Sequence, residues 1–275
     1  VVGESKTVGE HMLADERLPL ISFTGSVRVG KHVAAVIAAR LGRAILELGG
    51  NNAIIVEPDA GLELAVRAIV FGAVGTAGQR CTSTRRIIAH QSIVDELCER
   101  LARAYASVPI GDPLAPDTLM GPLISAQARD RLVSIVQEAV AAGASVVCGG
   151  GKPQRPERGY FMEPTILRDV RPDMGVAREE LFGPVLPVIR YTDDDDVLAM
   201  ANDTPHGLAA YVFTSDLGTA LRAAEALEAG SVCVNEPHFG VHLPHSGLKQ
   251  SGVGLDRSPY SLEEYLTLKR VSIRK

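Results

Sequence analysis

The sequence lacks the long apolar stretch that a membrane-spanning helix requires. Such a helix needs about 18 uninterrupted apolar residues, and the longest candidate, residues 62–74, is interrupted by Glu63, Arg67 and Gly72. The first residues also lack a charged region followed by an apolar one, so we expect no signal peptide. These absences predict a soluble protein with a cytoplasmic location and no membrane partner.

Cysteine is scarce, and positive charge is not in excess. Cys81, Cys98, Cys148 and Cys233 form no Cys-x-x-Cys pair, and no histidine stands at ligand spacing. This pattern argues against a disulfide framework and against a zinc site, so we expect no metal. The 28 basic and 33 acidic residues give a formal net charge of −5, and we therefore expect no nucleic-acid partner.

Short apolar runs alternate with amphipathic segments along the chain. The 275 residues are 46% hydrophobic, enough for the core of one large domain or two ordinary ones. We expect strands at residues 20–24, 44–48, 52–56, 86–89, 145–148, 185–191, 208–213 and 231–235, and helices at residues 29–41, 62–74, 94–106, 128–141, 197–202 and 220–229. Strands that alternate with helices in this way are typical of parallel βαβ units. The sequence therefore predicts an α/β fold.

Acidic residues precede two of the expected helices. Asp59 lies before the helix at residues 62–74, where we expect it to be the N-cap. Four carboxylates at residues 193–196 precede the helix at residues 197–202. Such a run suggests a cation site, but acidic groups are also favoured at the positive end of a helix dipole. We prefer the second interpretation.

Two strand ends carry groups suited to ligand binding or catalysis. The first strand runs through Thr24 into a glycine–serine turn before a helix, where free backbone N–H groups can bind a phosphate. An ordinary structural turn has the same pattern. Glu47 ends the next strand and is followed by two glycines after Leu48. Because burial disfavours the charged form of a carboxyl, Glu47 is suited to be a general base near neutral pH.

Two later segments carry a thiol and a pair of carboxylates. Cys81 follows a glycine-containing turn and stands next to Arg80, whose positive charge lowers the pKa of a thiol. Free cysteine is commonly a small buried apolar residue, which is our interpretation of the other three. Glu179 and Glu180 precede an apolar turn, where they either cap a loop or accept hydrogen bonds from a ribose diol.

The order of these segments resembles the aldehyde dehydrogenase superfamily. Its Phe-Thr-Gly-Ser turn, Glu-Leu-Gly-Gly box, Gly-Gln-x-Cys box and Glu-Glu-x-Phe-Gly-Pro box stand at residues 23–26, 47–50, 78–81 and 179–184. The closing Pro-x-x-Gly-x-Lys-x-Ser-Gly motif of the family is similar to residues 244–252, which follow Asn235. The resemblance covers the whole chain.

The resemblance implies a partial Rossmann-like cofactor domain followed by an α/β catalytic domain of the aldehyde dehydrogenase type. Residues 1–50 correspond to the C-terminal part of the NAD(P)-binding domain and residues 51–249 to the nucleophile-bearing domain. Residues 250–275 correspond to a tail whose last part alternates like a strand. In the family such a strand builds the oligomer, so we expect a homodimer or homotetramer.

The resemblance also implies the chemistry. Cys81 attacks the carbon of a small aldehyde substrate, hydride leaves for NAD or NADP, and Glu47 activates the water that cleaves the resulting thioester to the acid. The oxyanion is expected near the backbone N–H of Cys81. The implied cofactor contacts are Thr24, Gly25, Ser26, Gly30, Leu48, Glu180 and Phe182. The implied substrate pocket contains Arg80, Phe239 and His245.

Substrate and cofactor choice stay open. His245 stands where the closing motif usually has an aromatic residue, as in some members that act on amino-aldehydes, whereas residues 50–55 and 78–86 resemble the aminoadipate-semialdehyde branch. One possible role of Arg80 is to bind a carboxylate on the aldehyde. The alternative is that it only lowers the pKa of the thiol or pairs with a nearby acid. NAD and NADP are distinguished at the adenosine ribose, which the resemblance places upstream of Val1.

Three rival functions remain at this stage. A coenzyme-A-acylating dehydrogenase passes the acyl group to a second thiol, but that branch generally does without the base at Glu47. A fragment that folds without turnover is the second rival. The third is a cysteine hydrolase, which requires a histidine base, and none of the seven histidines lies in a recognisable motif.

Overall fold

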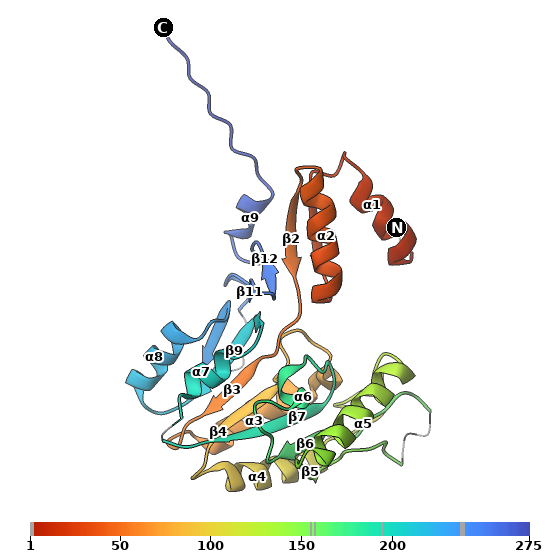
Figure 1. Ribbon diagram of the computed structural model, residues 1–275, viewed down its shortest axis with the longest axis vertical. Helices are drawn as coiled ribbons and strands as arrows, with labels where there is room; N and C mark the ends of the chain where they lie inside the picture. The colour runs from red at the N-terminus through yellow and green to blue at the C-terminus, as the bar shows by residue number, and fades with distance from the viewer. Residues whose placement is uncertain (1–2, 155, 157, 194, 237–239) are drawn as a thin grey trace. The chain divides into compact units, whose positions relative to one another are not determined.

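The computed structural model describes residues 3–154, 156, 158–193, 195–236 and 240–275. The chain divides into two compact units (Figure 1): the first is Val1–Gly49 with Phe239–Lys275, and the second is Gly50–His238. The division after Gly49 coincides with the domain boundary expected near residue 50. The later division lies ahead of the boundary expected at residue 249, because His245 pairs with Asp256 in the chain segment whose β12 (Gly252–Val253) pairs with β2 (Arg43–Glu47).

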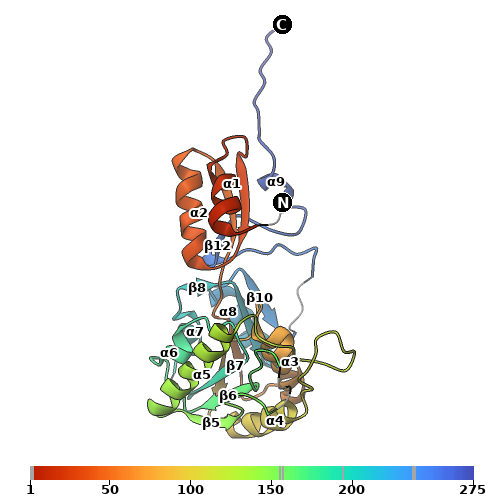
Figure 2. The same ribbon diagram turned by 90° about the vertical axis from the view of Figure 1, so that its right-hand side faces the viewer.

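The first unit is built on a sheet in the order β1-β2-β12. β1 (Leu20–Thr24) runs parallel to β2, and β12 runs antiparallel to it. The helix α2 (Val27–Ala39) lies along this sheet (Figure 2) and buries its apolar side against it. The core consists of Leu13, Ile21, Val33, Ile37, Leu46 and Leu48. The remaining elements are η1 (Ser5–Gly9), α1 (Glu10–Ala14), β11 (Leu248–Lys249) and α9 (Ser261–Glu264).

The second unit is built on a sheet in the order β10-β9-β3-β4-β7-β6-β5. Its neighbours run parallel except β5, which is antiparallel to β6. The strands are β3 (Ala53–Val56), β4 (Arg86–His90), β5 (Ser145–Cys148), β6 (Thr165–Arg168), β7 (Val185–Tyr191), β9 (Ala209–Phe213) and β10 (Ser231–Val234), with a short β8 (His206–Gly207) outside this sheet. The strands β3, β4 and β9 are buried throughout, as in a parallel sheet covered on both faces.

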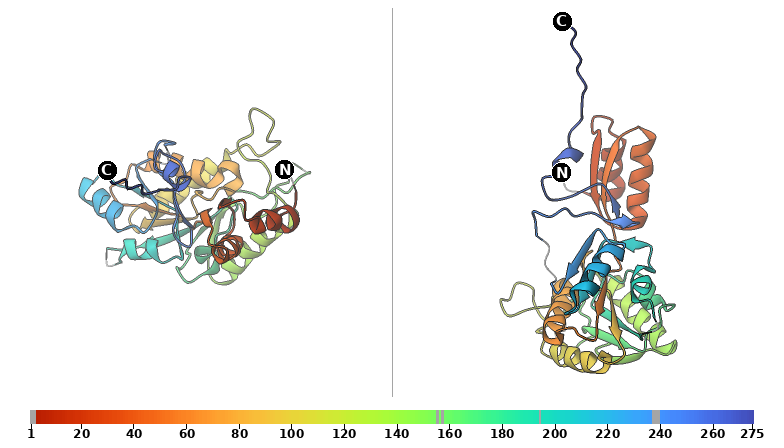
Figure 3. Two further views of the ribbon diagram at one scale, coloured as in Figure 1. Left: turned by 90° about the horizontal axis from the view of Figure 1, so that it is seen from above. Right: turned by 90° about the vertical axis from the view of Figure 1, so that its left-hand side faces the viewer.

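Helices cover both faces of this sheet. They are α3 (Leu62–Val74), α4 (Val94–Ala106), α5 (Ala126–Ala141), α6 (Gly175–Arg178), α7 (Val197–Asn202) and α8 (Leu217–Ala226). Side chains of α7 and α8 complete one apolar cluster on the sheet. The helices α3 and α4 lie on the opposite side, as the turned views show (Figures 2 and 3). The predicted α/β fold is confirmed.

The expected elements agree with the described ones to within three residues at each end. The sequence did not indicate η1, α1, the helical turn at residues 75–78, β6, α6, β8, β11, β12 or α9. The four carboxylates before α7 were expected to favour the positive end of its dipole, and one of them, Asp196, caps the helix: its side chain accepts a hydrogen bond from Ala199 N at 2.9 Å. Asp194 lies outside the described residues.

The predicted N-cap at Asp59 is wrong. The cap position of α3 is Gly61, which forms no side-chain capping bond. The carboxylate of Asp59 instead accepts hydrogen bonds from Thr214 Oγ1 and Ser215 N, both at 2.9 Å. Asp59 lies two residues before the cap position, so its side chain reaches the end of β9 rather than the first turn of the helix.

The C-terminal segment forms no strand with the described residues. Residues 266–275 extend away from α9 (Figure 3), and their apolar side chains, among them Leu268 and Ile273, are strongly exposed. The predicted pairing of this segment in an oligomer stays a prediction. Among the described residues no helix is long and apolar enough to cross a bilayer.

Candidate active site

Glu47 is a buried carboxyl at the end of β2 in the first unit. Its residue is only 7% exposed, and neither carboxyl oxygen has a hydrogen-bond partner among the described residues. Burial raises the pKa of Glu47 to about 7; the charge of Asp256 adds to this shift and that of Arg257 opposes it. A carboxyl with a pKa near neutrality can both accept and release a proton under physiological conditions.

The strands on either side of β2 fix the backbone of Glu47. Its carbonyl accepts a hydrogen bond from Gly25 N at 3.1 Å, and its Cα pairs with Gly252 of β12. A Cβ at Gly252 would overlap the carbonyl oxygen of Leu46. The glycine of the closing motif is therefore required for β12 to approach this strand.

The rest of the closing motif holds the Glu-Leu-Gly-Gly box. Leu48 N donates to Ser251 O at 2.8 Å, and the Ser251 hydroxyl donates to Gly49 O at 2.6 Å. A Cβ at Gly247 would overlap the backbone of Ser251. Two motifs about 200 residues apart in the sequence thus form one structure in the first unit.

A serine cap forms the turn before α2. Ser26 is the N-cap of α2 and its Oγ accepts a hydrogen bond from Val29 N at 3.4 Å. The first amides of a helix have no intrahelical acceptor and can bind an anion. A Cβ at Gly30 would overlap the side chain of Leu48, so packing of α2 against the end of β2 accounts for this glycine. Thr24 ends β1 with its side chain exposed.

In the second unit, a left-handed turn leads from α3 to the cysteine. Within η2 (Gly75–Gly78), Thr76, Ala77 and Gly78 have φ values of 56°, 52° and 67°. Left-handed geometry costs a non-glycine residue roughly 1–2 kcal/mol, so surrounding contacts must hold this turn. A Cβ at Gly78 would overlap the carbonyl oxygen of Gly183. The cysteine box therefore packs directly on the Glu-Glu-Leu-Phe-Gly-Pro box.

Asn52 ties the loop of Cys81 to the sheet. Its Nδ2 donates to Cys81 O at 2.7 Å and to Ser83 O at 2.8 Å, and its Oδ1 accepts from Ala209 N at 3.0 Å. Asn52 is 2% exposed, so water cannot readily replace these bonds. The Cys81 side chain itself is partly exposed.

Arg85 is a second fixed support of the same loop. The residue is 1% exposed, and its guanidinium donates to Gly78 O at 2.6 Å and to Arg80 O at 2.7 Å. Burial lowers the pKa of Arg85 to about 10, opposed by the charges of Glu180 and Cys81. Arg85 therefore stays cationic at neutral pH, and its charge attracts the thiolate form of Cys81.

Glu180 and the Cys81 backbone both lie close to Gly50. Oε1 of Glu180 accepts a hydrogen bond from Gly50 N at 3.1 Å. A Cβ at Gly50 would come within 2.8 Å of Cys81 O. Phe182 has a left-handed φ of 54°, its residue is 44% exposed, and the Arg85 guanidinium lies 5.3 Å from the centre of its ring.

The side chain of Arg80 turns toward the end of α3. Its NH2 donates to Phe71 O at 3.1 Å, and its guanidinium lies 4.9 Å from the centre of the Phe71 ring. Its Nε is buried and has no hydrogen-bond partner among the described residues. No carboxylate of the described residues pairs with it. Phe239, predicted in the substrate pocket, lies outside the described residues.

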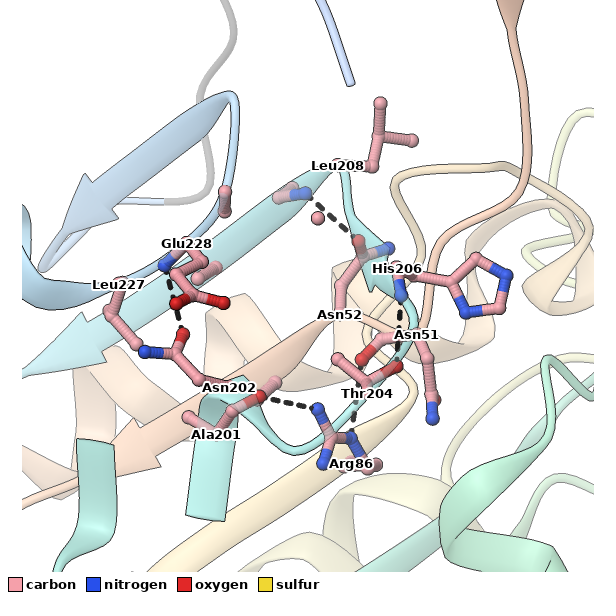
Figure 4. Close-up of a pocket in the computed structure, with 15 residues that line it drawn as sticks. Asn51, Asn52, Arg86, Ala201, Asn202, Thr204, His206, Leu208, Leu227 and Glu228 are labelled. Carbon is pink, nitrogen blue, oxygen red and sulfur yellow. Dashed lines mark hydrogen bonds between the residues drawn. The ribbon is translucent and has the colours of Figure 1, made fainter. Parts of the chain in front are cut away.

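A small polar cavity lies beside the start of β3 and β4 (Figure 4). Arg86, which the sequence did not single out, donates to Asn51 O at 3.2 Å and to Ala201 O at 2.9 Å, tying β4 to α7. The cavity has a volume of about 20 Å³, room for one water molecule. It is too small for an aldehyde substrate. Among the described residues, no cluster of histidine, cysteine and carboxylate side chains is arranged to hold a metal ion.

The comparisons with known proteins show the family. Residues 1–271 match the model of the aldehyde dehydrogenase family, and the chain belongs to that family. It is 39% identical over 269 residues to a betaine aldehyde dehydrogenase of Brucella anthropi. The aligned region covers 97% of this chain and 55% of the relative. It is 41% identical over 263 residues to the alpha-aminoadipic semialdehyde dehydrogenase of Bos taurus, covering 94% of this chain and 48% of the relative.

Solved structures show the same fold. A betaine aldehyde dehydrogenase from Staphylococcus aureus, solved in complex with NAD+, superimposes with a TM-score of 0.93 at 36% identity, covering 97% of this chain and 54% of the other. An Escherichia coli NADP-dependent enzyme gives a TM-score of 0.94 at 38% identity, covering 98% of this chain and 56% of the other. The chain thus spans about half the length of the proteins it matches.

Proposed function

We propose that this chain carries the catalytic residues of an NAD(P)-dependent dehydrogenase that oxidises an aldehyde to a carboxylic acid. In this proposal Cys81 is the nucleophile and Glu47 is the base. The observation that carries it is Glu47: a buried carboxyl without hydrogen-bond partners among the described residues, whose pKa is raised to about 7. Family membership supports the same assignment.

The loop of Cys81 suits a nucleophile. Asn52 and Arg85 hold the backbone on both sides of the cysteine, so the thiol needs little reorganisation before it attacks. The cation at Arg85 favours the thiolate, which is the reactive form. Attack of this thiolate on the aldehyde carbon places a negative charge on the substrate oxygen, and we propose that the backbone N–H of Cys81 helps to stabilise it.

Glu47 acts in the hydrolytic half of the reaction. It accepts a proton from water while the water oxygen attacks the carbonyl carbon of the Cys81 thioester. The carbon–sulfur bond then breaks and the thiolate leaves. A base at this position favours water as the acyl acceptor and disfavours transfer to coenzyme A, which needs no such base.

Each unit, taken by itself, has residues suited to bind one part of a dinucleotide. In the first unit, Ser26 caps α2 and leaves first-turn amides that suit a diphosphate. In the second unit, Glu180 accepts one hydrogen bond from Gly50 through Oε1, and its other oxygen suits a ribose hydroxyl, with Phe182 beside it. When bound, the nicotinamide accepts the hydride of the substrate. We propose NAD or NADP in this role, in line with the two solved relatives.

We propose that the substrate is a small aldehyde, and that Arg80 contributes to its choice. The guanidinium of Arg80 has a buried Nε without a hydrogen-bond partner and no acidic partner among the described residues. It is therefore suited to bind a carboxylate on the substrate. The alpha-aminoadipic semialdehyde dehydrogenase relative supports the same idea. We further propose a cytoplasmic homodimer or homotetramer, in which the exposed apolar residues of the C-terminal segment are covered.

The assignment is tested by rapid mixing of the intact protein with cofactor and aldehyde, following the absorbance of the reduced nicotinamide. We expect Cys81→Ala to abolish the signal. We expect Glu47→Gln to keep the first burst while slowing the steady state by roughly 100-fold or more. Cys98→Ala is the matched control, since burial raises the pKa of Cys98 to about 11. Turnover by Cys81→Ala with loss in Cys98→Ala would overturn the proposal.

A further inference from the structure

The carboxyl of Glu47 has a buried histidine beside it. The Nε2 atom of His245 lies 3.5 Å from Oε2 of Glu47, and both side chains are more than nine-tenths buried. The only other histidine–glutamate pair among the described residues, His32 with Glu10, is exposed on the surface of the same unit. A buried pair at this distance can exchange a proton with little motion of either side chain.

The backbone holds His245 in this position. His245 N donates to Asp256 O, and Asp256 N donates to His245 O, both at 2.8 Å. Since Pro244 precedes it, the chain before His245 is also restricted. A reciprocal pair of backbone hydrogen bonds therefore holds the backbone of His245 at the place from which its ring reaches the carboxyl.

The surroundings of the pair favour the neutral form of both members. Burial raises the pKa of Glu47 to about 7 and lowers the pKa of His245 from its ordinary value. Asp256 and Arg257 are the charged groups that act on both, Asp256 favouring the protonated forms and Arg257 the unprotonated ones. Burial thus favours the neutral form of each residue, so a proton that reaches the His245 ring is held there only briefly.

We propose that His245 is the proton acceptor that restores Glu47 after each hydrolysis. This proposal rests on the proposed function of Glu47. The water proton first moves to a carboxyl oxygen of Glu47 as the water attacks the Cys81 thioester. It then moves to Nε2 of His245, leaving a carboxylate beside an imidazolium. The Nε2 proton then passes to a water molecule that enters beside the pair, which restores the neutral ring that burial favours. No redox partner is needed.

The relay distinguishes His245 from a residue that only lines the substrate pocket. A pocket residue would change the affinity for the aldehyde and the burst in which the reduced cofactor forms. A relay residue acts after that burst, so its loss slows only the steady state. The loss should be smaller than that from removing the base, because solvent can still take the proton from Glu47 slowly.

The test uses the intact protein with His245→Asn, His245→Ala and His245→Phe. In all three we expect an unchanged burst and a steady-state rate lowered about tenfold, below the roughly 100-fold typical of a lost general base. Added imidazole should restore the steady-state rate of His245→Ala, and the rate should follow the imidazole base concentration as pH is varied. His32→Asn is the matched control and should behave like the wild type.

The outcomes separate this inference from the function on which it rests. A normal steady state in Glu47→Gln would overturn the role of Glu47 itself. Slow hydrolysis in Glu47→Gln, together with a normal rate and pH profile in His245→Asn, would overturn the relay alone. Wild-type turnover by His245→Phe would show that His245 only fills space. Slow His245→Ala without imidazole rescue would assign it a structural role and equally overturn the relay.

Discussion

Replacement of Asn52 by alanine should loosen the loop of Cys81 at a measurable cost in stability. The substitution removes three hydrogen bonds and leaves Cys81 O, Ser83 O and Ala209 N without their side-chain partner. A lost hydrogen bond at a buried group costs about 1 kcal/mol, so the three together cost roughly 3 kcal/mol. Denaturant unfolding followed by far-UV circular dichroism measures this loss.

The same substitution should also change the reactivity of Cys81, and a neighbouring residue provides the control. Asn51 is as deeply buried as Asn52, but its Nδ2 donates to Ala177 O and Arg178 O and not to the cysteine loop. We expect Asn51→Ala to lose comparable stability while alkylation of Cys81 by iodoacetamide keeps its wild-type rate. In Asn52→Ala that rate should change severalfold. A loss of stability below about 1 kcal/mol for Asn52→Ala, or equal alkylation rates in both variants, would refute this reasoning.

Three further substitutions test single contacts. Arg80→Met should lower kcat/KM more for an aldehyde bearing a carboxylate than for a neutral aldehyde of similar length; an equal loss on both would remove the role as carboxylate reader. Ser26→Ala removes the N-cap of α2 and should cost about 1 kcal/mol of stability and weaken cofactor binding, measured by calorimetry, while Ser134→Ala serves as a surface control. Ala77→Gly should raise the Tm, because the left-handed φ of 52° costs alanine roughly 1 kcal/mol; an unchanged or lower Tm would show that the buried methyl group matters more.

The sequence predicted the secondary-structure elements far better than the side-chain contacts that support the candidate site. Helices such as α4 (Val94–Ala106) and strands such as β7 (Val185–Tyr191) follow from local apolar periodicity. Asp196 and Asp59 show that helix caps are hard to predict from the neighbouring sequence alone. Both stand before helices, but the cap depends on spacing to within one residue, and Asp59 finds a partner directly after a strand, about 155 residues later.

Arg85 and Asn52 were missed for a related reason. Arg85 stands in an Arg-Arg pair before a strand and Asn52 in an Asn-Asn pair after two glycines, patterns that are also common on surfaces. Their roles depend on burial against the cysteine loop, which only the assembled sheet order creates. The motif glycines were recognised, but the reason for Gly78 is the carbonyl of Gly183, more than 100 residues away.

Glu47 should make the folded protein less stable as the pH rises, which is the cost of keeping a base ready for proton transfer. The folded protein holds the Glu47 proton up to a pH of about 7, whereas its ordinary pKa is 4.5. Between these values the unfolded chain binds fewer protons than the folded one, so the free energy of unfolding falls as the pH rises. A shift of this size corresponds to roughly 3 kcal/mol once the pH exceeds the folded pKa.

A comparison of the wild type with Glu47→Gln isolates this effect. Glutamine stays neutral, so its protein lacks the penalty, and the Tm of the variant should rise relative to the wild type as the pH is raised from 5 to 8. His245, whose pKa is lowered by burial, costs stability as the pH falls below its ordinary value of 6.5, but it is present in both proteins and its contribution largely cancels. Any pH-independent cost of burying the amide in the variant changes the difference in Tm by the same amount at every pH. The dependence of that difference on pH is unchanged. A flat difference in Tm across this range would mean that Glu47 is already ionised in the folded protein and that burial does not raise its pKa.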